Sequence, residues 1–211
     1  MAEECGYVAL PEPLTRTAMV AAPLLGEAAS ASEMASEWLA ALASGELIAT
    51  AGLENALVED ADRAGLLLLQ QGDQMTAVPS GDFSAEKNAS VDPSRQLFTV
   101  DARGGEALPV SSARALDLGA LTCAAESLGL AQRMVDMTVA YTADRQQFGK
   151  PVGSFQAVKH HMADVAVKLE YARGPVYRAA WAMDAGAANA SVYVSHAKLA
   201  ATEAAALAAK N

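Results

Sequence analysis

The sequence predicts a mostly α-helical protein with a small β segment in the middle of the chain. Hydrophobic residues make up 52% of its 211 residues but aromatic residues only 5%, so the apolar mass is mostly Ala, Leu and Val, which favours closely packed helices. Apolar residues recur at helical spacing toward both ends, whereas short apolar runs alternate with turn formers between them. We expect a helical segment at 1–44, a reduced β domain at 45–110 and an antiparallel helical bundle at 111–211.

Two prolines divide the helical pattern of the first segment. Pro11 and Pro13 predict the end of a first helix and the start of a second, which covers roughly residues 14–25. A third helix is predicted to start at Ser30, because Ser30 and Glu33 match a capping box.

The middle segment has the pattern of strands. Four short apolar runs are bounded by Gly, Asp, Asn, Pro and Ser, which favours strands. They lie at residues 47–50, 66–69, 75–78 and 97–100. Because so few strands cannot close a barrel, we expect a compact β segment whose edges are covered by neighbouring elements.

The longest helical pattern follows the strands. Ser111 or Ser112 can cap it, and a helix unbroken to Tyr141 would be about 45 Å long at roughly 1.5 Å per residue. A second apolar stripe begins at Phe155, and Gly174-Pro175 predicts a kink within it.

An alanine-rich pattern from about Ser191 predicts the last helix. This pattern is still running at Asn211 and has no stop signal. We therefore expect either a truncated chain or a disordered end.

The formal charge of −10 limits the partners that bulk charge could attract. A nucleic-acid backbone or an anionic membrane would be repelled, so an anionic ligand needs a local basic site. Cys5 and Cys123 lie far apart and predict reduced thiols. No signal peptide or spanning apolar run is present, so we expect a cytoplasmic protein. Adjacent His160 and His161 point about 100° apart on a helix, so no metal site is expected there.

The stretch 141–164 concentrates groups that could bind a ligand. It reads as the end of one helix, a polar turn at Gly149 and Pro151, and the start of another helix capped by Ser154. A guanidinium, amides, flat apolar rings and the free N–H groups of a helix start suit a phosphate-bearing aromatic ligand. The side chains concerned are those of Arg145, Gln147, Phe148, Phe155 and Gln156.

Structural roles are the alternative for these residues. Arg145 could pair with Asp144 or cap the helix C-terminus, where cations are common. Phe148 and Phe155 could be core residues, because aromatic side chains often pin helix–turn corners.

Three motifs in the second half of the chain resemble the acyl-CoA dehydrogenase family. They are Leu-Gly-Leu-Ala-Gln-Arg at 128–133, Arg-Gln-Gln-Phe-Gly-Lys-Pro at 145–151, and Phe-Gln-Ala at 155–157 followed by Met-Ala-Asp at 162–164. Weaker echoes occur at 3–6, 44–49 and 92–95, so the resemblance covers most of the chain. It implies an N-terminal helical domain, a middle β domain and a C-terminal four-helix bundle that assembles into dimers and tetramers. It also implies FAD-dependent oxidation of an acyl-CoA thioester between Cα and Cβ.

The resemblance assigns roles to the residues of the 141–164 stretch. The Arg145 position in the family usually contacts the FAD pyrophosphate of a neighbouring subunit, and the Gln147 and Phe148 positions flank that contact. The Phe155 and Gln156 positions lie along the adenosine end. A planar two-pronged donor beside a helix start suits a diphosphate, which agrees with this assignment.

The chain departs from the family at its catalytic base. The reaction needs a carboxylate that takes the α-proton. The family places this glutamate either at the position of Gly119 or in a segment after the last helix seen here, so no catalytic residue is predicted. Glu126 lies about 10 Å further along the helix at roughly 1.5 Å per residue, which favours a structural role. Between Thr50 and Asp60 the chain is also too short for the family's flavin-contacting loops.

These features resemble the base-lacking subunit of a heteromeric acyl-CoA dehydrogenase of the actinobacterial steroid-CoA type. We expect an α2β2 heterotetramer whose homologous partner supplies the glutamate and holds most of the acyl-CoA, with an electron-transfer acceptor. One alternative is a self-sufficient homo-oligomeric acyl-CoA dehydrogenase whose base lies outside these residues. Another is a non-enzymatic helical structural or interaction protein.

Overall fold

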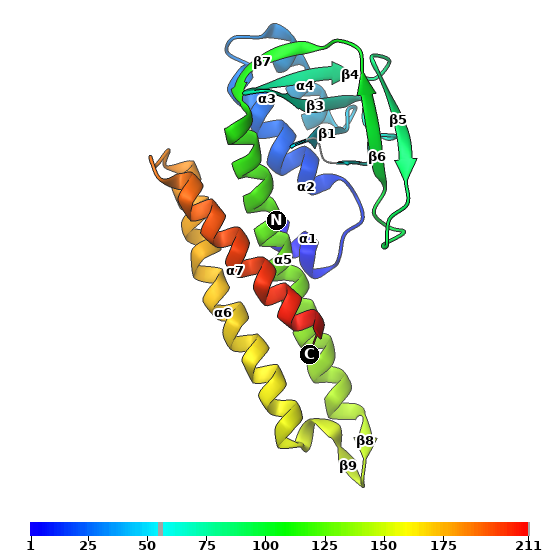
Figure 1. Ribbon diagram of the computed structural model, residues 1–211, viewed down its shortest axis with the longest axis vertical. Coiled ribbons are helices and arrows are strands. Elements are labelled where there is room, and N and C mark those ends of the chain that lie inside the picture. Colours follow the sequence, from blue (N-terminus) through cyan, green and yellow to red (C-terminus); the bar gives the residue numbers. More distant parts are fainter. Residues whose placement is uncertain (55–56, 211) are drawn as a thin grey trace. The chain divides into compact units, whose positions relative to one another are not determined.

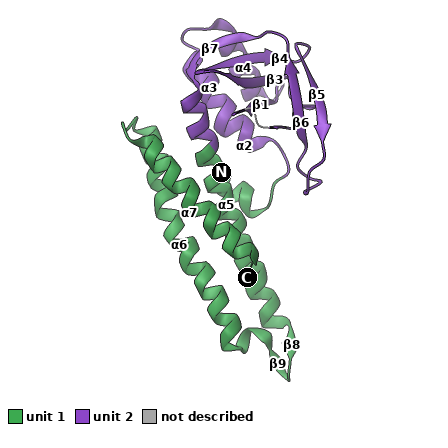
Figure 2. Ribbon diagram, viewed as in Figure 1, with its two compact units in different colours: residues 1–10, 120–211 green, residues 11–119 purple. Residues whose placement is uncertain are grey.

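The computed structural model describes residues 1–54 and 57–210 (Figure 1). The chain divides into two compact units, one of residues 11–119 and one of residues 1–10 and 120–211 (Figure 2). The expected division into 1–44, 45–110 and 111–211 stays a prediction. Residues 55, 56 and 211 lie outside the described residues, so the expectations for the segment between Thr50 and Asp60 and for the end of the chain fall partly outside them.

The 11–119 unit begins with helices. The predicted helix at 14–25 is present as consecutive pieces that extend to residue 28: α2 (Leu14–Arg16), the π-helical turn η1 (Thr17–Ala21) and α3 (Ala22–Ala28). The π turn ends two residues before Pro23, which has no N–H to donate to the preceding turn.

Helix α4 (Glu33–Ser44) starts at a different cap from the one predicted. Its N-cap is Ser32, whose Oγ accepts a hydrogen bond from the Ala35 N–H at 3.1 Å. The predicted cap at Ser30 is therefore wrong. Ser32 stands three residues before Ala35, whose N–H it accepts, and the Ser32 backbone has the extended conformation of a cap residue. The helix ends as predicted at Gly45, which has φ 79°.

Two small sheets follow. One has the order β1-β3-β4-β7, in which β1 and β3 are parallel and the other pairs antiparallel; the other has the order β2-β6-β5 and is antiparallel. The strands are β1 (Ala49–Gly52), β2 (Val58–Glu59), β3 (Leu66–Gln71), β4 (Gln74–Pro79), β5 (Phe83–Asn88), β6 (Leu97–Ala102) and β7 (Glu106–Ser111). The predicted runs at 66–69, 75–78 and 97–100 are confirmed as strands, whereas the run at 47–50 is confirmed only for its last two residues, because β1 begins at Ala49; β2, β5 and β7 are additional.

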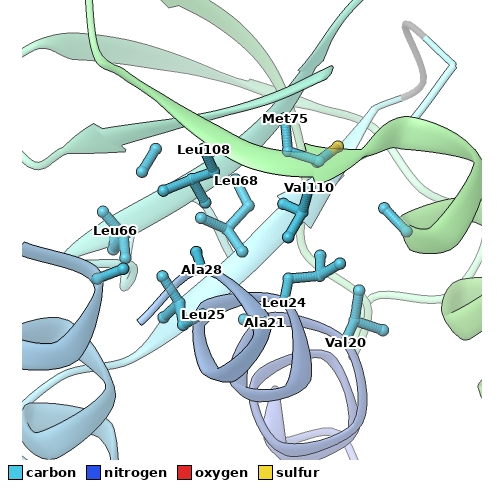
Figure 3. Packing of buried hydrophobic residues seen from close by; sticks show 14 residues of the cluster. Val20, Ala21, Leu24, Leu25, Ala28, Leu66, Leu68, Met75, Leu108 and Val110 are labelled. Carbon is cyan, nitrogen blue, oxygen red and sulfur yellow. The ribbon is translucent and has the colours of Figure 1, made fainter. Parts of the chain in front are cut away.

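Alternation along the strands builds a core on both faces of the larger sheet. Leu66 and Leu68 of β3 pack against η1 and α3, whereas Leu67 between them joins the core of the second sheet. Figure 3 shows the helix-side core, which includes Val20, Ala21, Leu24, Leu25, Ala28, Met75, Leu108 and Val110. A strand buried on both faces explains the unbroken run of leucines.

The second unit contains long helices. It comprises α1 (Ala2–Tyr7), the remainder of α5 (Ser112–Asp144), a hairpin of β8 (Gln146–Gln147) and β9 (Lys150–Pro151), the 3₁₀ turn η2 (Val152–Ser154), α6 (Gln156–Asp184) and α7 (Ala190–Lys210). Helix α5 has the predicted start, since Ser111 Oγ accepts from the Arg114 N–H at 3.3 Å. Helix α6 continues through Pro175. Helices α6 and α7 lie side by side and bury mainly Val, Leu and Ala (Figure 1).

Two glycines let α1 pack directly on α5. A Cβ atom at Gly129 would overlap the carbonyl oxygen of Glu3, and a Cβ atom at Gly6 would overlap the carbonyl oxygen of Glu126. Both positions therefore require glycine, because backbone lies where a side chain would begin. This close approach gives a physical reason for Gly129 in the 128–133 motif.

A polar network holds the same short helix against α6. Arg173 forms an ion pair with Glu3, and its Nη2 donates to Gln132 Oε1 at 2.8 Å. Tyr177 donates to the other oxygen of Glu3 at 2.8 Å. Charge-assisted hydrogen bonds of this kind are stronger than neutral ones, so Glu3 anchors α1. Among the helices that the structure describes, none is both long and apolar enough to cross a membrane.

Candidate functional site

The 141–164 stretch forms a small hairpin between two long helices. Helix α5 ends at Asp144, and Gln146 and Gln147 pair with Pro151 and Lys150. This register leaves Phe148 and Gly149 as a two-residue turn. The predicted polar turn is thus a short β-hairpin, whose backbone pairing holds the segments 146–147 and 150–151 antiparallel.

The turn has a backbone conformation that suits Phe148 poorly. Phe148 has φ 54° and Gly149 has φ 77°, the pattern of the type I′ turn, in which both central residues have positive φ. Glycine adopts this conformation readily, but for a bulky aromatic residue it is a genuine outlier. Strain of this kind, of order 1–3 kcal/mol, concentrates at functional sites.

The rings of this corner face solvent and each other. Phe148 is 91% exposed, so it is not a core residue. Its ring meets that of Phe155 edge-on at a centroid distance of 6.1 Å, and Lys150 Nζ lies 4.4 Å from the Phe155 centroid. The corner therefore presents an apolar edge with a cation beside it.

Arg145 is fixed through its backbone and open at its side chain. Its N–H donates to the Tyr141 carbonyl at 2.8 Å, and its carbonyl accepts from the Val152 N–H at 2.7 Å. Its exposed guanidinium makes no ion pair or side-chain hydrogen bond with any other described residue. The alternative pairing with Asp144 is absent from this arrangement.

The start of α6 also stays open. Its N-cap is Phe155, whose apolar side chain cannot accept a hydrogen bond from the first N–H groups of the helix. The predicted cap at Ser154 is wrong, because the Ser154 hydroxyl donates instead to the Pro151 carbonyl at 2.7 Å. Gln156 is exposed on the first turn, with its Nε2 3.4 Å from His160 Nε2, and Gln147 is exposed on β8.

All five predicted cofactor-contacting residues lie along the short segment from Arg145 to Gln156. The segment joins an unpaired guanidinium, an uncapped helix start of a long helix and an exposed aromatic edge. These groups fit the anionic and aromatic portions of a dinucleotide.

Gly119 lies on the part of α5 that belongs to the 11–119 unit. It is half-buried, and a Cβ atom there would lie 3.0 Å from Leu53 Cδ1. A side chain at this position would therefore have to move the Leu53 methyl group by a few tenths of an ångström. Glu126 lies where α1 crosses α5, so it takes part in helix packing.

Metal-binding side chains do not cluster in the part of the chain that the structure describes. No group of three His, Cys, Asp or Glu residues there could hold an ion. Cys5 is buried and Cys123 half-buried, and both are free thiols.

Asp60 is an unusual residue that the sequence patterns do not single out. Its side chain is buried, its φ is 53°, and desolvation raises the pKa of its carboxyl. Next to it, Glu59 pairs with Arg16 at 3.0 Å and with Arg95, which belongs to the 92–95 echo. The sequence gives no signal for it, because the strand β2 that precedes it is also not predicted.

Known proteins have sequences similar to this chain. The family model described as "Acyl-CoA dehydrogenase, C-terminal domain" matches residues 109–211. Acyl-CoA dehydrogenase IpdE2 of Mycolicibacterium smegmatis is 38% identical over 175 residues, which cover 83% of this chain and 53% of that protein. Acyl-CoA dehydrogenase IpdE2 of Mycobacterium tuberculosis is 35% identical over 202 residues, or 96% of this chain and 59% of that protein. The chain thus spans between about half and three fifths of the length of these relatives.

Solved structures show the same fold at lower identity. A variant of the Tcur3481-Tcur3483 steroid ACAD matches with a TM-score of 0.85 at 24% identity, covering 99% of this chain and 66% of that one. The ChsE4-ChsE5 complex from Mycobacterium tuberculosis matches at 0.82 with 22% identity, covering 99% and 66%. Butyryl-CoA dehydrogenase from Megasphaera elsdenii matches at 0.82 with 21% identity, covering 96% and 66%.

The predicted mostly helical fold with a small β segment is therefore confirmed. The order of helices, reduced sheets and long C-terminal helices agrees with these structures over nearly the whole chain. The sequence match over the C-terminal helices also points to an acyl-CoA dehydrogenase. The chain belongs to the acyl-CoA dehydrogenase family.

Proposed function

We propose that this chain is a subunit of a FAD-dependent acyl-CoA dehydrogenase that introduces a Cα=Cβ double bond into an acyl-CoA. In this proposal it contributes Arg145 and its neighbours to a FAD held mainly by a homologous partner, which also supplies the catalytic glutamate. The observation that carries the proposal is the combination of an open Arg145 corner with a base position occupied by Gly119.

The corner is suited to a cofactor held by another chain. The guanidinium of Arg145 is exposed and has no ionic partner among the described residues, so it is free to bind an anion that another chain holds. The Phe148 ring likewise projects into solvent from a strained turn. Such groups gain binding energy only when a ligand or a second subunit covers them.

The proposed roles follow from the chemistry of each side chain. Arg145 would bind the diphosphate through its two-pronged donor face, assisted by the first N–H groups of α6. Phe148 and Phe155 would contact the adenosine end, flanked by the amides of Gln147 and Gln156. FAD, when bound, supplies the acceptor for the hydride from Cβ.

The proton from Cα has no acceptor at the family's position in this chain. Gly119 has no side chain, and the Leu53 methyl group occupies the space beside it. General-base catalysis requires a carboxylate within hydrogen-bond reach of the proton, so in this proposal the partner provides it. Only residues 53–57 separate β1 from β2, which leaves little chain for loops that hold a flavin ring.

Two of the similar structures bear on the partner and the substrate. One is named as a complex of ChsE4 with ChsE5, and another as a steroid ACAD with two component names. By analogy we propose a homologous acyl-CoA dehydrogenase as the partner in an α2β2 assembly, a steroid side-chain CoA thioester as the substrate, an electron-transfer acceptor and a cytoplasmic location.

Co-purification with the partner tests the proposal. We expect no flavin spectrum and no dehydrogenase activity from the chain alone, and one FAD per pair of chains in an active complex. Arg145→Ala should lower the FAD occupancy of the complex, whereas Arg103→Ala, another exposed arginine, should not. One FAD per chain with activity from the chain alone would instead support a self-sufficient enzyme. Absence of flavin from every complex would support a structural protein.

A further inference from the structure

Lys150 is a second exposed cation in the Arg145 corner. Its ammonium lies 4.4 Å from the centroid of the Phe155 ring and forms no ion pair with any other residue that the structure describes. Lys168 on α6, by contrast, pairs with Glu203 at 2.8 Å. Two open cations in one corner form a local basic site in a chain whose formal charge is −10.

The register of the hairpin brings Lys150 close to Arg145. Lys150 is paired directly with Gln147. The Val152 N–H donates to the Arg145 carbonyl at 2.7 Å, which continues the ladder beyond the two paired positions. Arg145 and Lys150 are therefore diagonal neighbours on one face of the hairpin. The Cα atoms of such neighbours lie roughly 7–8 Å apart, so two long side chains can reach the same ligand.

The charges around the corner favour an anion. No Asp or Glu occurs from residue 145 to residue 163, although the chain has 25 of them. The first turn of α6 therefore has no acidic residue to complement the positive end of the helix dipole. Lys150 lies over the ring of Phe155, the N-cap of this helix, where a cation is unfavourable for the helix itself. This placement suits a bound anion better than it suits the stability of α6.

We propose that Lys150 is a phosphate-binding residue, whose ammonium binds the diphosphate of the dinucleotide that Arg145 contacts. The inference rests on the proposed function and adds to that site a residue to which the family resemblance gives no role. A diphosphate is dianionic, so one arginine does not balance its charge. Arg145 presents a planar fork and Lys150 a compact point charge, and the two can bind different oxygens of the same group.

The Phe155 ring has a positioning role in this arrangement. Phe155 is half-buried, whereas Phe148 is 91% exposed. The cation–π contact holds the flexible lysine side chain against a ring that is itself held by the fold. A side chain ordered before binding loses less conformational entropy when the ligand arrives. Phe155 thus acts on the ligand partly through Lys150.

Titration of the flavin-free complex with FAD tests the role of Lys150. Lys150→Met keeps the length of the side chain and removes its charge, so it should weaken FAD binding about tenfold at low ionic strength. The difference from the wild type should shrink toward about twofold near 1 M salt, because salt screens an exposed cation. Lys150→Arg should retain most of the affinity. Lys87→Met, which changes an exposed lysine on β5, should bind FAD as the wild type does.

Other outcomes of this titration would overturn the assignment. An equal loss at low and high salt would show that Lys150 only supports the hairpin. Unchanged FAD affinity with a raised KM for the acyl-CoA would show that Lys150 binds the phosphates of CoA instead. If Arg145→Ala lowers FAD affinity and Lys150→Met does not, the inference fails and the proposed function stands. A wild-type complex that never binds flavin would overturn both.

A double-variant cycle tests the contact with Phe155. Phe155→Leu removes the ring but keeps an apolar side chain, so Lys150 loses the contact that holds it. Lys150→Met should then weaken FAD binding only about threefold in the Phe155→Leu chain, against about tenfold in the wild type. Equal losses in the two backgrounds would show that the ring does not position the ammonium.

Discussion

Gly129 of α5 and Glu3 of α1 are in direct backbone contact, since the Cβ atom of any other residue at 129 would overlap the Glu3 carbonyl oxygen. The same helix pair meets again at Gly6 and Glu126. Glu3 is at the same time the ionic partner of Arg173 on α6. One short N-terminal helix therefore depends on a close backbone fit and on one carboxylate.

The first prediction concerns this contact. Gly129→Ala should lower the free energy of unfolding by about 1–3 kcal/mol, because the methyl group forces α1 away from α5 and its polar contacts. Urea denaturation followed by circular dichroism measures the change. Gly26→Ala is the matched control, since a Cβ atom there would lie 3.9 Å from Leu39 Cδ2 and should fit. Equal stability of the Gly129→Ala variant and the wild type would show that α1 does not pack as described.

The second prediction concerns a buried hydroxyl. Thr50 on β1 is fully buried, and its Oγ1 has no hydrogen-bond partner among the residues that the structure describes. Thr50→Val should raise the free energy of unfolding by about 1 kcal/mol, because an unsatisfied polar group is replaced by an apolar group of the same shape. Thr142→Val should not stabilise the chain, because the Thr142 hydroxyl donates to the Thr138 carbonyl at 2.8 Å. Thermal unfolding of both variants decides the matter.

The sequence predicts elements whose signals are local. The start of α5 follows from a serine that accepts from the backbone three residues later, and the strand at 66–69 follows from an apolar run. Strand β5 escapes detection because its residues are half-buried or exposed and mostly polar, and β7 because it contains Pro109, which a strand tolerates at the edge of a sheet.

The start of α4 and the hairpin of the site are harder to predict, because local patterns do not decide between equivalent groups or identify an unusual turn. Serines at 30 and 32 both qualify as caps, and only tertiary contacts decide between them: Ser32 Oγ also donates to Glu106 on β7 at 2.5 Å. Phe-Gly is not among the dipeptides preferred in a type I′ turn, so turn preferences do not predict the hairpin at Phe148. Rules of local preference fail at functional or strained positions.

The third prediction concerns the pH dependence of stability at Asp60. Burial raises its pKa, as do the charges of Asp62 and Glu12, whereas Arg63 and Arg16 lower it. A carboxyl whose pKa is higher in the folded state favours folding when it is protonated, and this contribution is lost as the pH rises through the raised pKa. Asp60→Asn should therefore be more stable than the wild type at pH 7.

The advantage of Asp60→Asn should shrink as the pH falls toward the ordinary aspartate value of 3.8. Asparagine also tolerates the positive φ at this position. Thermal unfolding between pH 4 and pH 8 measures the difference, and exposed Asp62→Asn is the control, for which no such convergence is expected. A difference that does not change with pH would show that charge burial is not its cause.

The last prediction separates stability from cofactor binding at the Phe148 turn. Asn-Gly is the preferred pair for a type I′ turn, so Phe148→Asn should relieve backbone strain and raise the free energy of unfolding by up to about 1 kcal/mol. If the exposed ring serves FAD, the same change should lower the FAD occupancy of the complex, measured by flavin absorbance per chain. Val91→Asn, which also replaces an exposed apolar residue, should alter neither quantity. Strain maintained at a functional site predicts opposite effects on stability and binding, whereas a purely structural turn predicts a gain in stability alone.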